Sequence, residues 1–176
     1  MGTKRVGLAR VEALLENLER ELDLSSATIK DAAYTGFTKV TATAAVTAAQ
    51  SGRTMIVGPL AAGLAADTVM TLPTAANGLF YRFVYVGGAA DAQDLQINTG
   101  SDTNFFIGGL AHLDTDTDDT NGIPDFVFSD NGSNSIVNVL TPNVGTWVEV
   151  YCDGTNWFLT GFVNSASNTA VSFADQ

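Results

Sequence analysis

Apolar residues near the N-terminus recur at spacings that alternate between three and four. These positions are Leu8, Val11, Leu15, Leu18 and Leu22. The spacing is the a/d repeat of a narrow helical seam, and it predicts a short α-helix over residues 1–24. Because such a seam forms only half of an interface, we expect the helix to associate with identical copies or to dock in a groove. A helix lying against its own domain is the alternative, and Leu14 widens the apolar stripe in its favour.

Three basic residues, Lys4, Arg5 and Arg10, stand at the start of this predicted helix. Positive charge at a helix N-terminus opposes the helix macrodipole, so these side chains are expected to meet another surface that is acidic. Together with the five seam positions, the three bases are the predicted assembly and docking residues.

The composition of the chain changes after Leu24. Small residues dominate residues 25–50, and Ala and Thr are densest over residues 41–49. The Thr and Val residues favour extended backbone whereas the Ala residues favour helix, so the composition assigns no regular element. We predict a connecting arm over residues 25–53.

From Thr54 onward the chain shows short β-like runs separated by turn residues. Nine candidate strands cover residues 54–57, 68–72, 79–86, 94–98, 104–107, 126–128, 135–140, 146–152 and 157–162. Their regular spacing predicts an antiparallel β-sandwich or jelly-roll-like domain over residues 54–176. The turn residues of 153–156 predict a hairpin between the last two runs. The predicted fold is therefore mainly β, preceded by an N-terminal α-helix and an extended arm.

Two of these runs carry informative face patterns. In residues 146–152, Trp147 and Tyr151 share one face, while Cys152 lies on the other as a predicted buried hydrophobic residue. Residues 79–86 are apolar on both faces except at Arg82, which predicts a central strand covered on both sides or a strand in a subunit interface. The candidate interface residues are Arg82, Phe83 and Tyr85. Arg82 is expected either to pair with an acid on an adjacent strand or to clamp a second subunit.

The charge of the chain is distributed unevenly. The net charge is −11; seven Lys and Arg accompany six acids through Arg53, whereas Arg82 alone accompanies thirteen acids from Thr54 onward. Such an acidic domain repels phosphate backbones, so we expect no nucleic-acid binding. No window reaches the length of a membrane span and no secretory leader is visible, so a soluble protein made in the cytoplasm is expected, with no membrane partner. The single cysteine excludes an intrachain disulfide.

An acidic stretch at residues 114–125 is the one candidate metal site. Asp114, Asp116 and Asp118 alternate as in calcium loops, and Asp125 takes the twelfth position. The sixth position is Asp119 where an EF-hand has Gly, the closing Glu is replaced by Asp, and the flanking runs are β-like, which together exclude an EF-hand. A looser calcium loop and a solvated acidic loop both remain open.

The sequence does not favour an enzyme. His112 is the only histidine and stands among apolar neighbours, which is more typical of a structural residue than of a catalytic one. No glycine-rich loop is followed by the Lys of a phosphate site, and no cofactor is expected.

Several phrases of the sequence resemble known virion proteins. The opening MGTKRVGLARVEALLENLEREL resembles the short N-terminal helix of structural proteins from marine tailed bacteriophages, including those that infect cyanobacteria. Three later phrases resemble the β-domains of phage decoration and fibre proteins. They are TAAQSG at residues 47–52, VMTLPTAANGLFYRFVYV at 69–86 and VYCDGTNWFLTG at 150–161.

The resemblance implies a capsid decoration or cement protein located on the capsid surface of the virion. It implies a homotrimer whose other partner is the major capsid protein, with the N-terminal helix as the capsid-binding element. The main alternative is a tail- or head-fibre module that binds host glycans, for which Tyr85, Trp147, Tyr151 and Trp157 are candidates if they face outward. A calcium-dependent lytic enzyme is a more distant alternative.

Overall fold

The computed structural model describes residues 36–60, 62–88, 93–115 and 125–176. The chain divides into two compact units, residues 1–35 and residues 36–176, and the description below concerns the second unit. The predicted N-terminal helix, its eight assembly residues and the first part of the predicted arm lie outside the described residues. Their prediction therefore stays a prediction.

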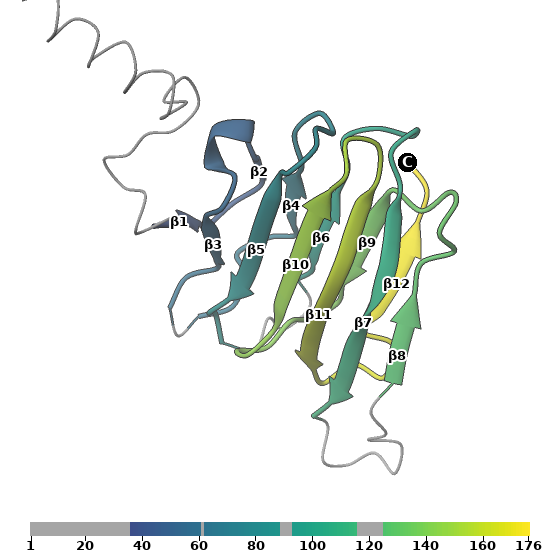
Figure 1. Cartoon of the computed structure of the whole chain (residues 1–176). Helices are drawn as coiled ribbons and strands as arrows, with labels where there is room; N and C mark the ends of the chain where they lie inside the picture. Colours follow the sequence, from purple (N-terminus) through teal and green to yellow (C-terminus); the bar gives the residue numbers. More distant parts are fainter. Residues whose placement is uncertain (1–35, 61, 89–92, 116–124) are drawn as a thin grey trace, which may run out of the picture. The chain divides into compact units, whose positions relative to one another are not determined.

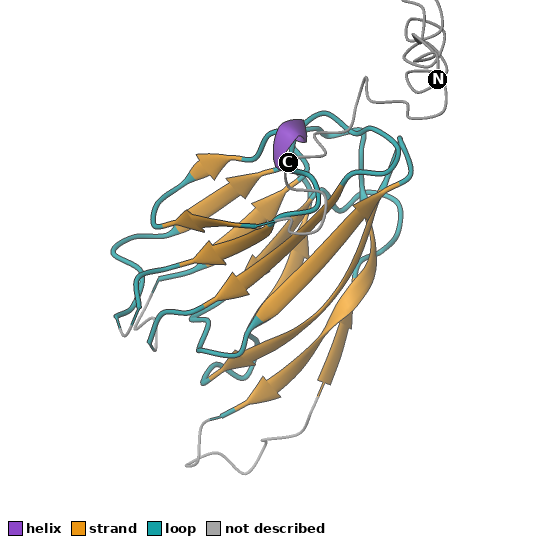
Figure 2. Ribbon diagram, turned by 60° about the vertical axis from the view of Figure 1, so that its left-hand side comes forward, coloured by secondary structure: helices purple, strands orange, loops and turns teal. Residues whose placement is uncertain are grey.

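The second unit consists of two β-sheets stacked face to face (Figures 1 and 2). The larger sheet has seven strands in the order β1-β3-β5-β10-β11-β7-β8, and the smaller has five in the order β12-β9-β6-β4-β2. The bounds are β1 Phe37–Val40, β2 Ala44–Ala45, β3 Thr54–Val57, β4 Thr68–Thr71, β5 Phe80–Tyr85, β6 Leu95–Asn98, β7 Phe106–Asp114, β8 Asp125–Phe128, β9 Ile136–Val139, β10 Trp147–Cys152, β11 Trp157–Ser165 and β12 Val171–Ala174. A 3-10 turn, η2, spans Ala48–Gln50.

The predicted mainly β fold with two layers is confirmed, but the prediction of purely antiparallel sheets is wrong. In the larger sheet β1–β3, β3–β5 and β11–β7 are parallel pairs, and in the smaller sheet β2–β4 and β4–β6 are parallel. From β1 to β7 the chain alternates between the sheets, so strands that are neighbours within one sheet are two apart in sequence and run in the same direction. Only β7–β8 and β10–β11 are consecutive strands paired within one sheet, and both pairs are antiparallel.

The predicted arm also needs correction over residues 36–53. This stretch contributes β1 to one sheet and β2 to the other, and the compact unit begins at Gly36. All nine predicted runs contain a strand, whereas β1, β2 and β12 were not predicted. The missed strands are short: β2 has two residues, and in β1 only Val40 is buried, so neither displays the alternation that marks a half-buried strand.

The core fills the space between the two sheets. On β5, burial alternates strictly, so Tyr81, Phe83 and Tyr85 point inward and are at most 1% exposed. Trp157 on β11 is fully buried, and its ring centroid lies 6.1 Å from that of Tyr81. Cys152 is buried as predicted. Alternation on the strands of the larger sheet therefore sends every second side chain into the core and leaves the others on the outer face.

The predicted hairpin between β10 and β11 is confirmed. Gly154 has a φ of 103°, a conformation that glycine adopts without strain. The Asp153 carboxylate accepts hydrogen bonds from the backbone N–H groups of Thr155 and Asn156, each at 2.8 Å. These bonds hold the pKa of Asp153 below its ordinary value.

Candidate functional site

The outer face of the seven-stranded sheet carries a large set of apolar side chains, which we call the aromatic face. Its members alternate with the core residues along the strands. They are Phe37, Ile56, Phe80, Val84, Ile107, Ala111, Phe126, Phe128, Trp147, Tyr151, Phe158 and Phe162. Five of the seven large hydrophobic residues that are exposed in the described chain belong to this set, so apolar exposure is concentrated here. An apolar surface of this kind marks a binding or assembly surface.

Strand registration arranges the aromatic face in rows that run across the strands. One apolar row consists of Ile56, Val84, Trp147, Phe162, Ala111 and Phe126, and a second consists of Phe80, Tyr151, Phe158 and Ile107. Between them lies a polar row of Thr54, Arg82, Glu149 and Thr160, with Phe37 and Phe128 at its two ends. The aromatic face is therefore a flat, striped surface rather than a cleft.

The centre of the polar row is an ion pair. Arg82 Nε lies 3.5 Å from Glu149 Oε1, and the two side chains are 43% and 21% exposed. The Arg82 guanidinium also lies over the Trp147 ring, 5.1 Å from its centroid. The predicted pairing of Arg82 with an acid on an adjacent strand is confirmed, because the two residues are direct partners in the β5–β10 register.

Tyr151 joins this pair to the second apolar row. Its hydroxyl donates a hydrogen bond of 2.9 Å to Glu149 Oε2, and this bond raises the pKa of the Tyr151 phenol. The Tyr151 ring is stacked on Phe80 with centroids 5.3 Å apart, and at the sheet edge Phe126 and Phe128 are 4.7 Å apart. These contacts order the side chains of the aromatic face before any partner arrives.

The outer face of the five-stranded sheet is more polar, although Val69 and Ile136 also lie on it. Gln96, Asn138 and Ser172 are partners in register across β6, β9 and β12. Gln96 Nε2 donates to Asn138 Oδ1 at 2.8 Å, and Asn138 Nδ2 donates to Ser172 Oγ at 3.3 Å. We call this row the amide ladder, and it presents polar groups that are already hydrogen-bonded to one another.

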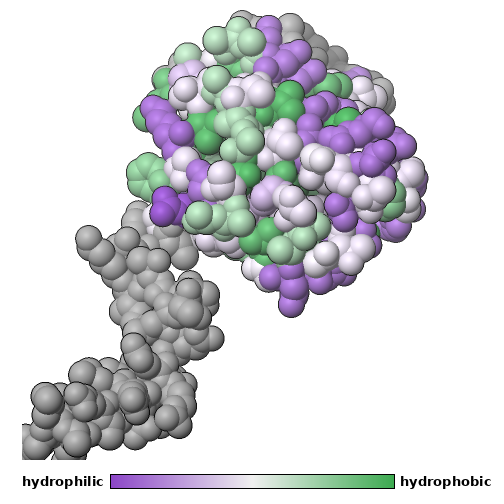
Figure 3. Space-filling view, turned by 90° about the horizontal axis from the view of Figure 1, so that it is seen from above, coloured by the Kyte–Doolittle hydropathy of each residue, from purple (hydrophilic) through white to green (hydrophobic). Residues whose placement is uncertain are grey.

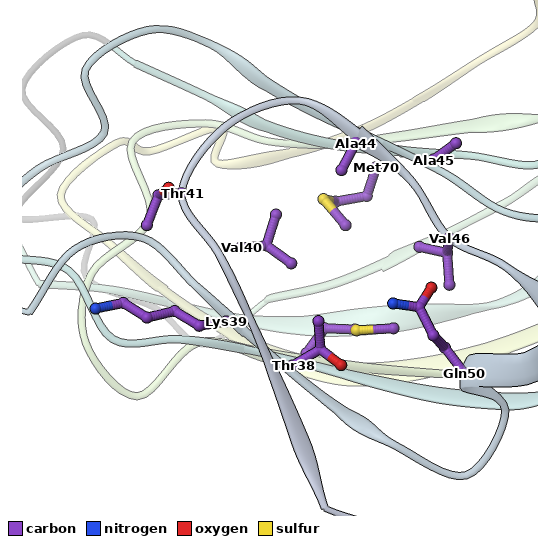
Figure 4. Close-up of a pocket in the computed structure, with 10 residues that line it drawn as sticks. Thr38, Lys39, Val40, Thr41, Ala44, Ala45, Val46, Gln50 and Met70 are labelled. Atoms are coloured by element: carbon purple, nitrogen blue, oxygen red, sulfur yellow. The ribbon is translucent and has the colours of Figure 1, made fainter.

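A cavity of about 260 Å³ lies where β1 and β2 connect the two sheets (Figure 4). It is lined mainly by apolar side chains, including Val40, Met55 and Met70. Met70 and Gln50 point toward the cavity in Figure 4, whereas the Lys39 amine points away from it. The residues that line the cavity do not bring together a set of acids, bases or nucleophiles.

Seen from above, hydrophobic and hydrophilic residues are interspersed on the molecular surface (Figure 3).

The predicted calcium residues are only partly described. Asp114 ends β7 and Asp125 begins β8, while Asp116 and Asp118 lie outside the described residues. His112 pairs in register with Asp125 and is 3% exposed; burial lowers its pKa, and Asp114 and Asp125 oppose that shift. Within the described part of the chain, no group of three or more His, Cys, Asp or Glu side chains is placed to hold a metal ion.

Two of the three predicted interface residues are placed elsewhere. Phe83 and Tyr85 are each 1% exposed and belong to the core, so their assignment to a subunit interface is wrong, and only Arg82 lies on the outer face. Alternation along β5 is the reason, because Arg82 shares its face with Phe80 and Val84.

The aromatic residues predicted for a glycan site divide in the same way. Trp147 and Tyr151 lie on the outer face, whereas Tyr85 and Trp157 are buried in the core. Sequence reasoning missed Phe158 and Phe162 on β11, although both follow the same alternation. The alternation of β11 was visible in the sequence, but the sequence alone did not identify which side of β11 would face the other sheet.

A scan against protein-family models, a search of curated proteins and a search of solved structures each returned no match to this chain. Within the described residues, no helix is long and apolar enough to cross a membrane.

Proposed function

We propose that this protein is a structural component of a phage virion, a decoration or cement protein that binds the capsid exterior and stabilises the head. The aromatic face is the observation that carries the proposal. A surface with Phe128 68% and Phe158 41% exposed is typical of a chain that works in an assembly. The resemblance of the N-terminal segment to virion structural proteins supplies the kind of assembly.

The charge distribution supports different roles for the N-terminal segment and the β-domain. The β-domain carries most of the acids, which keep a β-rich surface soluble and non-adhesive. The N-terminal segment carries Lys4, Arg5 and Arg10 and is the proposed capsid-binding element. A subunit that joins neighbouring capsid proteins adds contacts that must break together, so the head resists internal pressure better.

Incubation of the purified full chain with undecorated capsids tests this function. We expect stoichiometric, saturable binding that sediments with the capsids, and we expect decorated capsids to withstand higher temperature before they release DNA. Replacement of Leu15 by Asp should abolish binding, whereas Asn17→Asp adds the same single charge outside the seam and should not. A chain that binds host cells but not capsids would refute the decoration function.

A glycan-binding fibre module is the second candidate. Trp147 and Tyr151 lie outward beside Arg82 and Glu149, and aromatic rings next to polar groups are what sugars require. Phe80 stacks on Tyr151 and Arg82 lies over Trp147, so one side of each ring is already occupied. A glycan array with the wild-type chain and with Trp147→Ala tests this candidate: binding that depends on Trp147 would favour it over decoration.

A further inference from the structure

The aromatic face has the composition of a sheet face that is covered by another layer. An antiparallel sheet with one solvated face usually alternates apolar with polar residues, whereas strands covered on both faces are apolar throughout. β5 and β10 come close to the second pattern: Phe80, Val84, Trp147 and Tyr151 face outward while their inward neighbours are buried, and one paired charge on each strand interrupts the outer side. The five-stranded sheet covers the inner side of these strands, and the outer side has the composition of a surface that a partner covers.

The dimensions of the aromatic face match those of a specific interface. With neighbouring strands about 4.8 Å apart, the seven-stranded sheet is about 29 Å wide. The three rows span four residue steps, or about 14 Å, along β5, β10, β11 and β7, which side chains extend to about 20 Å; β1, β3 and β8 carry positions in two rows only, or about 13 Å with side chains. The area is therefore about 500 Å² on each partner, or about 1,000 Å² in total, which is about the minimum for a specific protein interface.

The distribution of charge identifies the partner. The aromatic face carries the bases Lys39 and Arg82 against one acid, Glu149, whereas the rest of the described chain has Arg53 against eight acids. Two copies of so acidic a protein repel each other at most surfaces, and they repel least at this one. The same face on a second copy is also the matching apolar surface that the described chain offers, because the other sheet presents the amide ladder.

The position of the ion pair determines how two such copies would be oriented relative to each other. Arg82 and Glu149 lie on the adjacent strands β5 and β10, so a two-fold axis parallel to these strands brings each Arg82 to the Glu149 of the other copy. The guanidinium has five N–H donors. Nε lies 3.5 Å from Glu149 Oε1 without forming a hydrogen bond, and the guanidinium makes no hydrogen bond within the described chain, so its terminal N–H groups can bind a second carboxylate. A two-fold pair also covers both aromatic faces with one contact.

We propose that two copies of this chain pair face to face through the aromatic face, with Arg82 of each copy bound to Glu149 of the other. The pairing deepens the proposed structural role and does not depend on capsid binding. It also differs from the homotrimer that the resemblance implies, because a closed two-fold contact joins copies in even numbers.

Light scattering of the purified full chain over a range of concentrations tests the pairing. We expect assemblies with an even number of copies. Phe158→Lys places a charge in the apolar contact and should weaken association at least tenfold, whereas Ser172→Lys places the same charge on the amide ladder and should leave association unchanged. A monomer, a trimer, or an assembly that Phe158→Lys does not weaken would overturn the proposal.

A charge exchange tests the orientation. Arg82→Glu and Glu149→Arg should each weaken association, because each places like charges at the two-fold contact. The double exchange restores opposite charges and should restore association. A double variant as weak as either single variant, with a circular dichroism spectrum like that of the wild type, would overturn the two-fold arrangement.

Capsid binding separates this proposal from the decoration function. A wild-type chain that is monomeric and still binds capsids overturns the pairing alone. A chain that pairs through the aromatic face and ignores capsids supports the pairing and overturns the decoration function.

Discussion

The two outer faces of this β-sandwich differ in the side chains that they present to their surroundings. Each sheet has one side in the core and must present the other to its surroundings. The five-stranded sheet presents Gln96, Asn138 and Ser172, whose side chains are hydrogen-bonded to one another. The seven-stranded sheet presents aromatic rows, with Phe158 41% exposed. The first face is hydrogen-bonded within the isolated chain, whereas the second leaves aromatic side chains in contact with water.

This difference shows which surface of the described chain can gain energy from a partner. Polar groups that are hydrogen-bonded internally gain little from a partner, because a partner would have to replace existing bonds. Apolar side chains gain from any surface that removes them from water. The binding energy available to the described chain therefore lies on one sheet, and substitutions on the two sheets should have different consequences.

The largest expected effect separates the two sides of β11. Trp157 is fully buried, so Trp157→Ala should lower the free energy of unfolding by about 3–5 kcal/mol through lost burial and a residual cavity. Phe158, the next residue, faces outward, and Phe158→Ala should cost about 0.5 kcal/mol or less in the monomer. Urea unfolding followed by circular dichroism measures both.

The dependence on protein concentration makes this comparison sharper. If copies pair through the aromatic face, the cost of Phe158→Ala grows as the protein concentration rises, whereas the cost of Trp157→Ala to the fold of each subunit stays large at every concentration. Equal costs for the two substitutions at low concentration would show that Phe158 belongs to the core of the monomer.

A smaller effect is expected when the amide ladder is broken. Asn138→Leu removes the donor and acceptor that link Gln96 to Ser172 and gives the polar face an apolar side chain. Because these groups are partly exposed, water can replace the lost bonds, and the cost should be about 1 kcal/mol. Thermal unfolding measures it, with Ser172→Ala, at the end of the ladder, as the milder control. A loss of several kcal/mol would mean that the ladder holds the sheet together and is more than a solvated surface.

The ion pair on the aromatic face should contribute less still to the stability of the monomer. Arg82 is 43% exposed, and pairs of this kind are typically worth less than about 1 kcal/mol. Arg82→Met keeps the aliphatic contact with Trp147 and removes the charge, so unfolding in low and high salt should differ from the wild type only in its salt dependence. A large loss that salt does not alter would assign Arg82 a packing role instead.

Much of the fold was readable from the sequence because alternation along a strand is a local property. Alternation located nine of the strands and placed Cys152 in the core, and the local turn residues located the hairpin at residues 153–156. Strand pairing is not local. The parallel pairs arise because the chain crosses between sheets after most strands, and turn residues mark that a strand ends without marking which sheet the next one joins.

The same limit explains the errors at the candidate site. The sequence identified β5 as apolar on both faces, but it could not tell which face would meet the other sheet, so Phe83 and Tyr85 were assigned to an interface when they form the core. Arg82 was placed correctly because a lone base on an apolar strand has few sites where its charge can be satisfied. The two apolar rows are a property of registration across six and four strands, which no single stretch of sequence contains.

The smallest effect concerns the protonation of Tyr151 and requires little change in stability. The Glu149 carboxylate accepts a hydrogen bond from the Tyr151 hydroxyl, so the pKa of Tyr151 in the folded chain lies above its ordinary value of about 10. The stabilising contribution of this bond is therefore complete below about pH 10 and is lost as the pH rises through the folded-state pKa. Absorbance titration of the wild type minus Tyr151→Phe isolates this one phenol. Glu149→Gln should bring the pKa of Tyr151 back toward its ordinary value, because a neutral amide no longer penalises the phenolate. A Tyr151 that titrates identically with Glu149 and with Gln would show that the polar row does not hold the two side chains together in solution, and the pre-ordered character of the aromatic face would lose its main support.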